Sequence, residues 1–289
     1  MKVKIVSGFH PLIPTPPLLY GGTELEAALT ANALIEAGFT VCLDASRTKT
    51  WDYFFTTPPP GQCAGDVTIS YVVPIDETSI HVFQGRPIQI SNPKVFASQP
   101  QKDYYINFIA DVDGPVIPNA IPEWFYEPRE RWDDGDYYLF MNRCDKNKGC
   151  KEFVDWCIQN HEKCIMITQN WFVEDPEYTK TVLDKAVNNG IQVKMNVDPL
   201  EKIELLKGAK AVVSFLSRNY FEGYGIWAHE ANWLRVPVIS TNVQAIPWTI
   251  MRGEINGKKV EKDENEWRKE RSYRSYKEAF VKLVSSVNV

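Results

Sequence analysis

The spacing of apolar residues changes twice within the first fifty positions of the chain. Residues 2–7 (KVKIVS) form a short apolar, β-branched run that is typical of a buried strand. Apolar residues then recur every three or four positions over 25–35, which predicts a helix that opens at Gly21 and Gly22 and ends at Gly38. Residues 39–43 alternate again as a strand. This order predicts a strand–loop–helix–strand unit of the parallel-sheet type.

Prolines and charged residues interrupt the pattern between residues 47 and 136. Apolar runs predict strands at 68–73, 80–84 and 88–90, and no helical spacing separates them. A proline-punctuated extended segment follows at 115–122, and residues 127–136 are charged and turn-forming. We therefore place a domain boundary near residue 134.

The second half of the chain alternates regularly between strand spacing and helix spacing. Five strands are predicted at 137–141, 164–168, 192–195, 211–215 and 237–240. Four helices are predicted between them at 151–160, 178–189, 200–206 and 226–234. Strands separated in this way form a parallel sheet that is covered on both faces. The chain is thus expected to be an α/β protein of two Rossmann-like domains, residues 1–134 and 135–261, with a charged helical tail over 262–289.

Composition narrows the classes of function. The 289 residues are enough for two domains of about 150 residues. The 32 Lys and Arg against 37 Asp and Glu give a net charge of −5, so the chain lacks the positive charge that a general nucleic-acid binder needs. The first 134 residues hold 9 basic and 16 acidic side chains, and the remainder holds 23 and 21. An anionic ligand is therefore expected on the second domain.

Cysteine spacing and hydropathy give an expectation for the cellular compartment of the protein. No apolar run approaches the ~18 residues that span a bilayer, and no signal peptide is recognised. The six cysteines match neither a metal knuckle nor a disulfide framework, so we interpret them as reduced thiols of a cytoplasmic protein. The four cysteines between 144 and 164 are expected to pack in the core rather than to bind zinc.

Two cations follow the strand 137–141. Arg143 and Lys148 are five residues apart and precede a helix, and Gly149 lies next to Lys148. An Arg fork and a Lys point charge at a helix N-terminus suit a diphosphate. A pair of solvated surface cations is the alternative interpretation of the same residues.

Glycines and carboxylates follow the strand 211–215. Gly223 and Gly225 allow backbone N–H groups of residues 223–226 to approach a phosphate at the start of the helix 226–234. Glu222 and Glu230 are eight residues apart, which is ~80° around a helix, so both can border one ligand. A helix cap and an exposed glutamate are the alternative here.

Five landmarks in this order resemble glycosyltransferase family 4, a retaining family with the GT-B fold. An Arg-x4-Lys-Gly stretch, a Glu-Gly-Phe-Gly-x4-Glu-Ala stretch and a Pro-Val-Ile strand form its carboxyl-terminal signature. The matching segments here are Arg143 to Gly149, Glu222 to Ala231 and Pro237 to Ile239. Residues 116–121 (VIPNAI) resemble the family's "VIPNGV" segment, and residues 21–24 (GGTE) resemble its amino-terminal glycine loop.

The resemblance implies a function and assigns roles. It implies two domains facing a cleft, a final helix that returns to the first, acceptor-side domain, and transfer of a hexose with retention from a nucleoside-diphosphate sugar, with no cofactor and no obligatory metal. Arg143 and Lys148 would hold the leaving diphosphate, Glu222 the sugar hydroxyls and Glu230 the ribose. The backbone of Gly223, Tyr224, Gly225 and Ile226 would contact phosphate or sugar, and Gly21 and Gly22 would close on the donor. The acceptor would be a sugar, glycolipid or glycoprotein.

The sequence departs from the family pattern at several positions. Asn142 stands where the family commonly has glycine, and Gln169-Asn170-Trp171 stands where it has Gly-x-Gly. Arg235 replaces a glycine before the Pro-Val-Ile strand, and residues 244–248 replace the usual Gly and Glu.

Histidines, the charged tail and two further functions complete the predictions. His10 and His81, the latter ending or following a strand, are candidates for contact with donor sugar or acceptor, while His229 is expected to pack. The charged tail has two interpretations, a helix that returns to the first domain and a surface that docks on an anionic membrane. A nucleotide-sugar epimerase and a catalytically silent nucleotide- or sugar-binding protein are the alternative functions.

Overall fold

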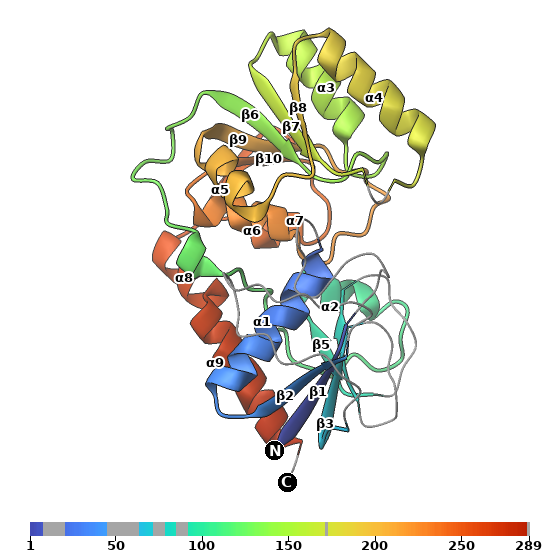
Figure 1. The fold of residues 1–289 in the computed structure, drawn as a ribbon, viewed down its shortest axis with the longest axis vertical. Helices are drawn as coiled ribbons and strands as arrows, with labels where there is room; N and C mark the ends of the chain where they lie inside the picture. The colour runs from blue at the N-terminus through green and yellow to red at the C-terminus, as the bar shows by residue number, and fades with distance from the viewer. Residues whose placement is uncertain (8–20, 45–63, 72–78, 85–91, 171–172, 288–289) are drawn as a thin grey trace. The chain divides into compact units, whose positions relative to one another are not determined.

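The computed structural model describes residues 1–7, 21–44, 64–71, 79–84, 92–170 and 173–287. The chain forms two compact units, each built around one sheet (Figure 1). The first unit comprises Met1–Glu123 and Asn265–Val289, and the second comprises Trp124–Glu264. The first segment of the first unit ends at Glu123, ahead of the domain boundary that the sequence pattern places near residue 134. None of the helices in the described ranges is long and apolar enough to cross a membrane.

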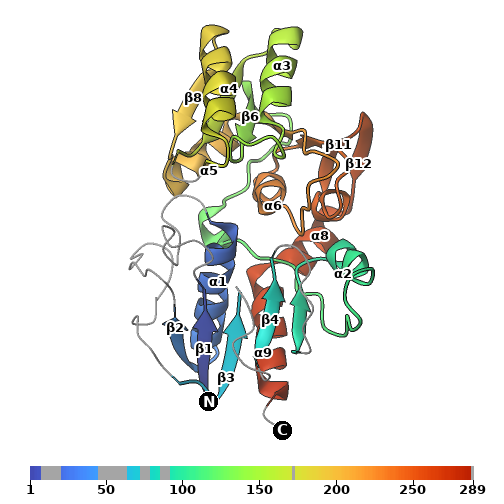
Figure 2. The same ribbon diagram turned by 90° about the vertical axis from the view of Figure 1, so that its right-hand side faces the viewer.

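The first unit contains a five-stranded parallel sheet in the order β2-β1-β3-β4-β5 (Figure 2). Its strands are β1 (Lys2–Val6), β2 (Thr40–Asp44), β3 (Val67–Ser70), β4 (Ile80–Phe83) and β5 (Lys94–Phe96). Its helices before the tail are α1 (Gly22–Glu36) and α2 (Gln99–Tyr105), and a 3-10 turn, η1, covers Glu123–Phe125. The predicted strand–helix–strand opening is confirmed. The sequence pattern missed β5 and α2, and the strand predicted at 88–90 lies outside the described residues.

The charged tail belongs to the first unit. It forms α8 (Glu264–Arg271) and α9 (Tyr273–Ser286), which are separated at Ser272, whose hydroxyl accepts from the N–H of Ser275 and caps α9. Helix α9 runs alongside α1 (Figure 1). The Thr30 and Tyr276 hydroxyls are 2.5 Å apart, and Asn32 donates to the Tyr273 hydroxyl at 2.6 Å. The predicted return of the last helix to the first domain is confirmed, and membrane docking stays a prediction.

The second unit contains a seven-stranded sheet in the order β12-β11-β10-β9-β6-β7-β8, parallel except for the β11–β12 pair. Its strands are β6 (Tyr137–Met141), β7 (Cys164–Thr168), β8 (Gln192–Met195), β9 (Ala209–Ser214), β10 (Val238–Ser240), β11 (Arg252–Ile255) and β12 (Lys258–Glu261). Its helices are α3 (Cys150–Asn160), α4 (Pro176–Asn188), α5 (Pro199–Lys207), α6 (Ile226–Trp233) and α7 (Ile246–Thr249). The alternating strands and helices predicted for this half are confirmed.

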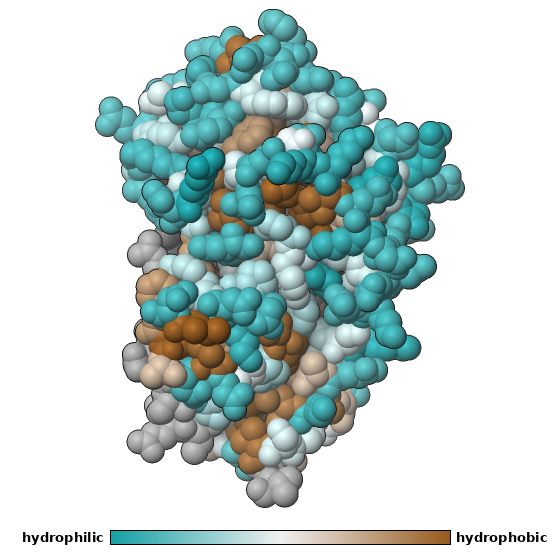
Figure 3. All heavy atoms as spheres, turned by 180° about the vertical axis from the view of Figure 1, so that it is seen from behind, coloured by the Kyte–Doolittle hydropathy of each residue, from teal (hydrophilic) through white to brown (hydrophobic). Residues whose placement is uncertain are grey.

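The core of the second unit lies between the sheet and its helices. Helices α3 and α4 lie side by side over one face (Figure 1), where Phe140 and Met166 from the strands meet Phe153 and Val182 from the helices. Hydrophilic residues cover most of the face of this unit that is seen in Figure 3. The amphipathic pattern of the helices thus directs their apolar stripes to the sheet.

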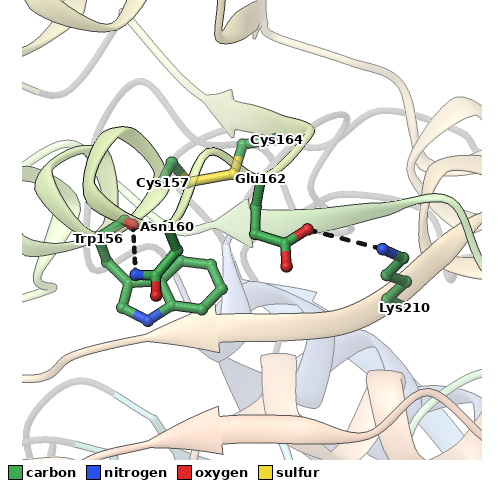
Figure 4. The surroundings of a disulfide bond; sticks show 6 residues. All are labelled: Trp156, Cys157, Asn160, Glu162, Cys164 and Lys210. Carbon is green, nitrogen blue, oxygen red and sulfur yellow. Dashed lines mark hydrogen bonds and ion pairs between the residues drawn. A yellow bond between two sulfur atoms is a disulfide. The ribbon is translucent and has the colours of Figure 1, made fainter.

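The cysteines do pack in this core, but they are not all reduced. Cys157 at the end of α3 and Cys164 at the start of β7 form a disulfide (Figure 4). Cys42 is also disulfide-bonded. Cys144 and Cys150 are buried thiols whose sulfur atoms lie 3.2 Å apart. The interpretation of the cysteines as reduced thiols is therefore wrong for Cys42, Cys157 and Cys164.

A buried carboxyl group lies where α1 meets the tail. Glu26 is 1% exposed, and this burial raises the pKa of its carboxyl well above the usual range. Hydrogen bonds with Tyr276 and Ala120 oppose only part of that shift. The folded chain therefore keeps a proton on Glu26 that the unfolded chain releases above about pH 4.3.

Glu26→Gln is expected to flatten the dependence of stability on pH. Because the folded-state pKa is raised, the contribution of Glu26 to stability falls as the pH rises above its unfolded value. The melting temperature of the wild type should drop more between pH 5 and pH 8 than that of the variant. Glu36→Gln, on the same helix but partly exposed, is the control. Equal pH dependence of wild type and Glu26→Gln would contradict the assignment.

Candidate functional site

The order of strands in the second sheet marks one edge as the place for a ligand. The chain runs outward from β6 through β7 to β8, and then returns to the other side of β6 as β9 and β10. Loops that leave the carboxyl ends of β6 and β9 therefore diverge to opposite faces. In open α/β sheets ligands bind at such a switch point. Arg143 and Lys148 follow β6, and Glu222 follows β9.

Asp145 organises the loop between β6 and α3. Its Oδ1 accepts hydrogen bonds from the backbone N–H of Asn147 at 2.8 Å and of Lys148 at 3.0 Å. Its Oδ2 lies 3.3 Å from Nη2 of Arg143. Gly149 then opens α3 with φ 74°, a conformation that favours glycine. One buried carboxylate thus shapes the loop and orients both of its predicted phosphate-binding residues.

The β6–α3 loop is joined to the chain that leaves β9. The N–H of Ser217 donates to the Asn147 carbonyl at 2.9 Å, and the Ser214 hydroxyl donates to the Lys148 carbonyl at 3.0 Å. A Cβ atom at Gly149 would lie 2.2 Å from the carbonyl oxygen of Phe215. The close approach of the two loops therefore requires glycine at position 149.

Lys148 and Glu222 meet across this junction. Nζ of Lys148 lies 2.8 Å from Oε2 of Glu222, and the two side chains are only 5% and 13% exposed. The ammonium also lies 4.3 Å from the ring centroid of Tyr220, within range of a cation–π interaction. A largely desolvated ion pair, flanked by an aromatic ring, is thus at the switch point.

Arg143 is held on the other side of the same loop. Besides Asp145, its guanidinium lies 3.3 Å from Oε1 of Glu174, in the connection between β7 and α4. Lys146 also reaches this connection, at 2.8 Å from Asp175. Arg143 therefore spans the exits of β6 and β7.

The predicted glycine segment starts α6. Gly225 is the N-cap, with φ 81°, and a Cβ there would lie 2.5 Å from Cδ1 of Ile246. Just upstream, the N–H of Glu222 donates to the side chain of Gln244 at 2.9 Å. Gly223 and Ile226 complete the segment. The left-handed conformation of Gly225 thus starts α6, whose first N–H groups have no partner within the helix, at the end of the chain segment that leaves β9.

The side chain of Tyr224 packs inside the second unit. The ring is buried, and its hydroxyl lies 3.0 Å from Nδ1 of His229. The Thr249 hydroxyl donates to the Tyr224 carbonyl. His229 is completely buried, as the sequence analysis expected for a packing residue.

Glu230 is enclosed by two partners. Its Oε1 accepts from the Tyr126 hydroxyl at 2.6 Å and from Nζ of Lys202 at 2.5 Å. Its side chain is 3% exposed. Burial, together with the charge of Glu230, raises the pKa of Tyr126 well above its usual range. A lysine on α5 and a tyrosine hydroxyl thus hold the same oxygen of Glu230.

The remaining predicted residues belong to the first unit. Gly21 and Gly22 lie at the start of α1, where the sequence placed them. His10 lies outside the described residues. His81 does not end or follow a strand, because it is the second residue of β4. It is 2% exposed and packs edge-on against Phe83, and this burial lowers its pKa to about 4.

The sequence analysis did not single out several residues that contact the predicted ones. They are Tyr126, Asp145, Glu174, Lys202 and Tyr220. Asp145 had a local signal. An Asp followed closely by an Asn and a Gly, as in Asp145, Asn147 and Gly149, is typical of a turn. The others act through contacts between segments far apart in the sequence, for which no local pattern exists. No group of three His, Cys, Asp or Glu side chains within the described ranges is arranged to hold a metal ion.

The family model for group 1 glycosyl transferases matches residues 123–268, half of the chain. The chain belongs to this family. The matched segment contains every predicted site residue of the second unit, from Arg143 to Glu230. Membership of family 4 in particular stays a prediction.

Solved structures and one curated relative are similar to this chain. AviGT4, a glycosyltransferase involved in avilamycin A biosynthesis, is 20% identical with a TM-score of 0.66, over 98% of this chain and 92% of that one. Anabaena HepE in complex with UDP-glucose is 11% identical with a TM-score of 0.69, over 99% and 100%. Both likenesses show the two-sheet GT-B fold. Uncharacterized protein 155L of Invertebrate iridescent virus 6 is 27% identical over 115 residues, which are 39% of this chain and 43% of that relative.

Removal of the Asp145 carboxylate is expected to destabilise the second unit. Asp145→Ala removes the acceptor of the Asn147 N–H and leaves the Lys148 N–H only the longer bond to the Asp145 carbonyl at 3.2 Å, at a cost of about 1–2 kcal/mol in the free energy of unfolding. Asp145→Asn keeps an acceptor oxygen and should retain most of the stability. Urea denaturation of the three proteins measures the difference. Unfolding curves of Asp145→Ala and Asp145→Asn that coincide would show that the loop does not depend on this acceptor.

Proposed function

We propose that the chain transfers a hexose from a nucleoside-diphosphate sugar to an acceptor hydroxyl, with retention of anomeric configuration. The observation that carries the proposal is the Lys148–Glu222 pair at the β6–β9 switch point of a group 1 glycosyl transferase. A cation for a phosphate and a carboxylate for sugar hydroxyls are in contact there. In a nucleoside-diphosphate sugar the diphosphate is bonded directly to the hexose, so one donor molecule can contact the cation and the carboxylate at the same time.

Arg143 and Lys148 would bind the leaving diphosphate. Guanidinium and ammonium groups form charge-assisted hydrogen bonds with phosphate oxygens, and these bonds strengthen as negative charge develops on the leaving group. Both cations have carboxylate partners, Glu174 and Glu222 among them. The donor must therefore share or replace these partners.

Glu222 and Glu230 would bind hydroxyl groups. Glu222 would accept from the hexose and Glu230 from the ribose, while the backbone N–H groups of residues 223–226 would face phosphate or sugar. Gly21 and Gly22 at the start of α1 would contact the donor from the first unit. His81 is left out of the proposed site because it is buried within β4.

The proposed reaction needs positioning and charge stabilisation rather than an enzyme nucleophile. The bond between the anomeric carbon and the diphosphate oxygen breaks, and the acceptor oxygen bonds to that carbon on the same face. The proton of the acceptor hydroxyl passes to the leaving phosphate. We propose that no cofactor and no obligatory metal takes part, and that the acceptor is a sugar, a glycolipid or a glycoprotein. The UDP-glucose bound to HepE supports a nucleotide-sugar donor for this chain.

Ligand-induced thermal shifts should identify the donor nucleotide. A nucleoside diphosphate at a hundred times its dissociation constant adds about 2.7 kcal/mol of stability. One of UDP, GDP or ADP is expected to raise the melting temperature by several degrees. Arg143→Ala and Lys148→Ala should each lower affinity about tenfold or more, because a charge-assisted hydrogen bond is lost. Lys180→Ala, on the exposed face of α4, is the control.

Product analysis then separates the candidate functions. NMR of the sugar released from the donor should show the anomer of the donor, in the presence or absence of EDTA. Binding without release or transfer would favour the silent binding protein, and a changed stereocentre elsewhere in the sugar would favour the epimerase. Absence of any thermal shift would contradict the proposed function.

A further inference from the structure

Three side chains at the exits of β6 and β7 are buried with polar atoms that lack partners. Oδ1 of Asn142, Oγ1 of Thr168 and both amide atoms of Gln169 make no hydrogen bond with the described residues. Gln169 is only 5% exposed. Burial of a carboxamide without partners costs free energy that an apolar side chain would not. Such a cost at the ligand edge of a sheet is expected where a ligand supplies the missing partners.

The backbone around Gln169 is fixed by the neighbouring strand exit. The N–H of Asn196 donates to the Thr168 carbonyl at 2.9 Å. The Asn196 side chain makes two bonds with Asn170, since it accepts from the backbone N–H of Asn170 at 3.2 Å and donates to the Asn170 side chain at 2.8 Å. Asn196 adopts a positive φ of 54° to do so. The position of Gln169 is therefore set before any ligand binds.

Gln169 lies on the side of the site where the nucleoside would be. Arg143 reaches the β7–α4 connection, in which Gln169 stands, through Glu174. Glu230, the proposed ribose-binding residue, is held by Lys202 in the first turns of α5, directly after β8. A donor whose diphosphate is at Arg143 and whose ribose is at Glu230 extends toward the exits of β7 and β8.

We infer that Gln169 binds the nucleobase of the donor through its carboxamide. A carboxamide offers a donor and an acceptor side by side, which match the adjacent N–H and C=O or N groups on the edge of a base. This inference rests on the proposed function, because it requires that the ligand is a nucleoside diphosphate. Gln169 then gives the site a higher affinity for nucleoside diphosphates than for diphosphates without a base.

Calorimetric titration of Gln169→Met tests this role. Methionine keeps the length of the side chain and removes both polar groups. The affinity for the nucleoside diphosphate that the wild type binds should fall about tenfold, while the affinity for inorganic pyrophosphate should change less than twofold. The melting temperature without ligand should stay equal or rise, because an unpaired buried amide has been replaced. Gln192→Met, an exposed glutamine on β8, is the matched control and should change none of these values.

The outcomes separate this inference from the proposed function. Equal losses for nucleoside diphosphate and pyrophosphate would overturn the role of Gln169 in binding the base, and so would unchanged affinities for both. In those cases the binding of nucleoside diphosphate by the wild type would still support the proposed function. A wild type that binds pyrophosphate but no nucleoside diphosphate would overturn both.

Discussion

The ion pair between Lys148 and Glu222 is the contact on which the rest of the site depends. It joins residues 74 positions apart, on loops that leave adjacent strands toward opposite faces of the sheet. Both side chains are largely removed from water, so loss of either partner would leave a buried charge uncompensated. The contact is possible because Gly149 lets the two loops approach and because Asp145 fixes the backbone of Lys148.

Arg143 and Lys148, the cations proposed to bind the diphosphate, already have carboxylate partners, and so does Lys202, which lies beside Glu230. Arg143 lies near Asp145 and Glu174, Lys148 contacts Glu222, and Lys202 contacts Glu230. A bound diphosphate therefore does not enter a bare positive patch. In the proposed function it would replace or share carboxylates as the partner of these cations, and the free energy of binding would be the difference between the two sets of contacts. Two of these carboxylates, Glu222 and Glu230, are the groups proposed to bind the sugar and ribose hydroxyls.

The sequence predicted those parts of the fold whose signals are local. The runs at 137–141 and 164–168 are continuous apolar segments between turns, and they are strands β6 and β7 with the predicted bounds. Strand β5 was missed because it is only three residues long and begins with Lys94, which is buried and paired with Asp111, whereas a lysine in a sequence pattern is taken as exposed. Strands β11 and β12 were not predicted, because the residues of this antiparallel pair are mostly polar and show no alternation of apolar and polar positions. The disulfide and the partners of Glu230 depend on segments that only the fold brings together.

The affinity of Glu222→Gln for inorganic pyrophosphate tests the central claim most directly. If Glu222 competes with a diphosphate for Lys148, removal of its charge should raise the affinity of the protein for pyrophosphate about fivefold, or roughly 1 kcal/mol, and Lys148→Ala should abolish that gain. Sugar transfer by Glu222→Gln should fall at the same time. An unchanged or weaker affinity of Glu222→Gln for pyrophosphate would show that Lys148 does not exchange Glu222 for phosphate, and would contradict the account.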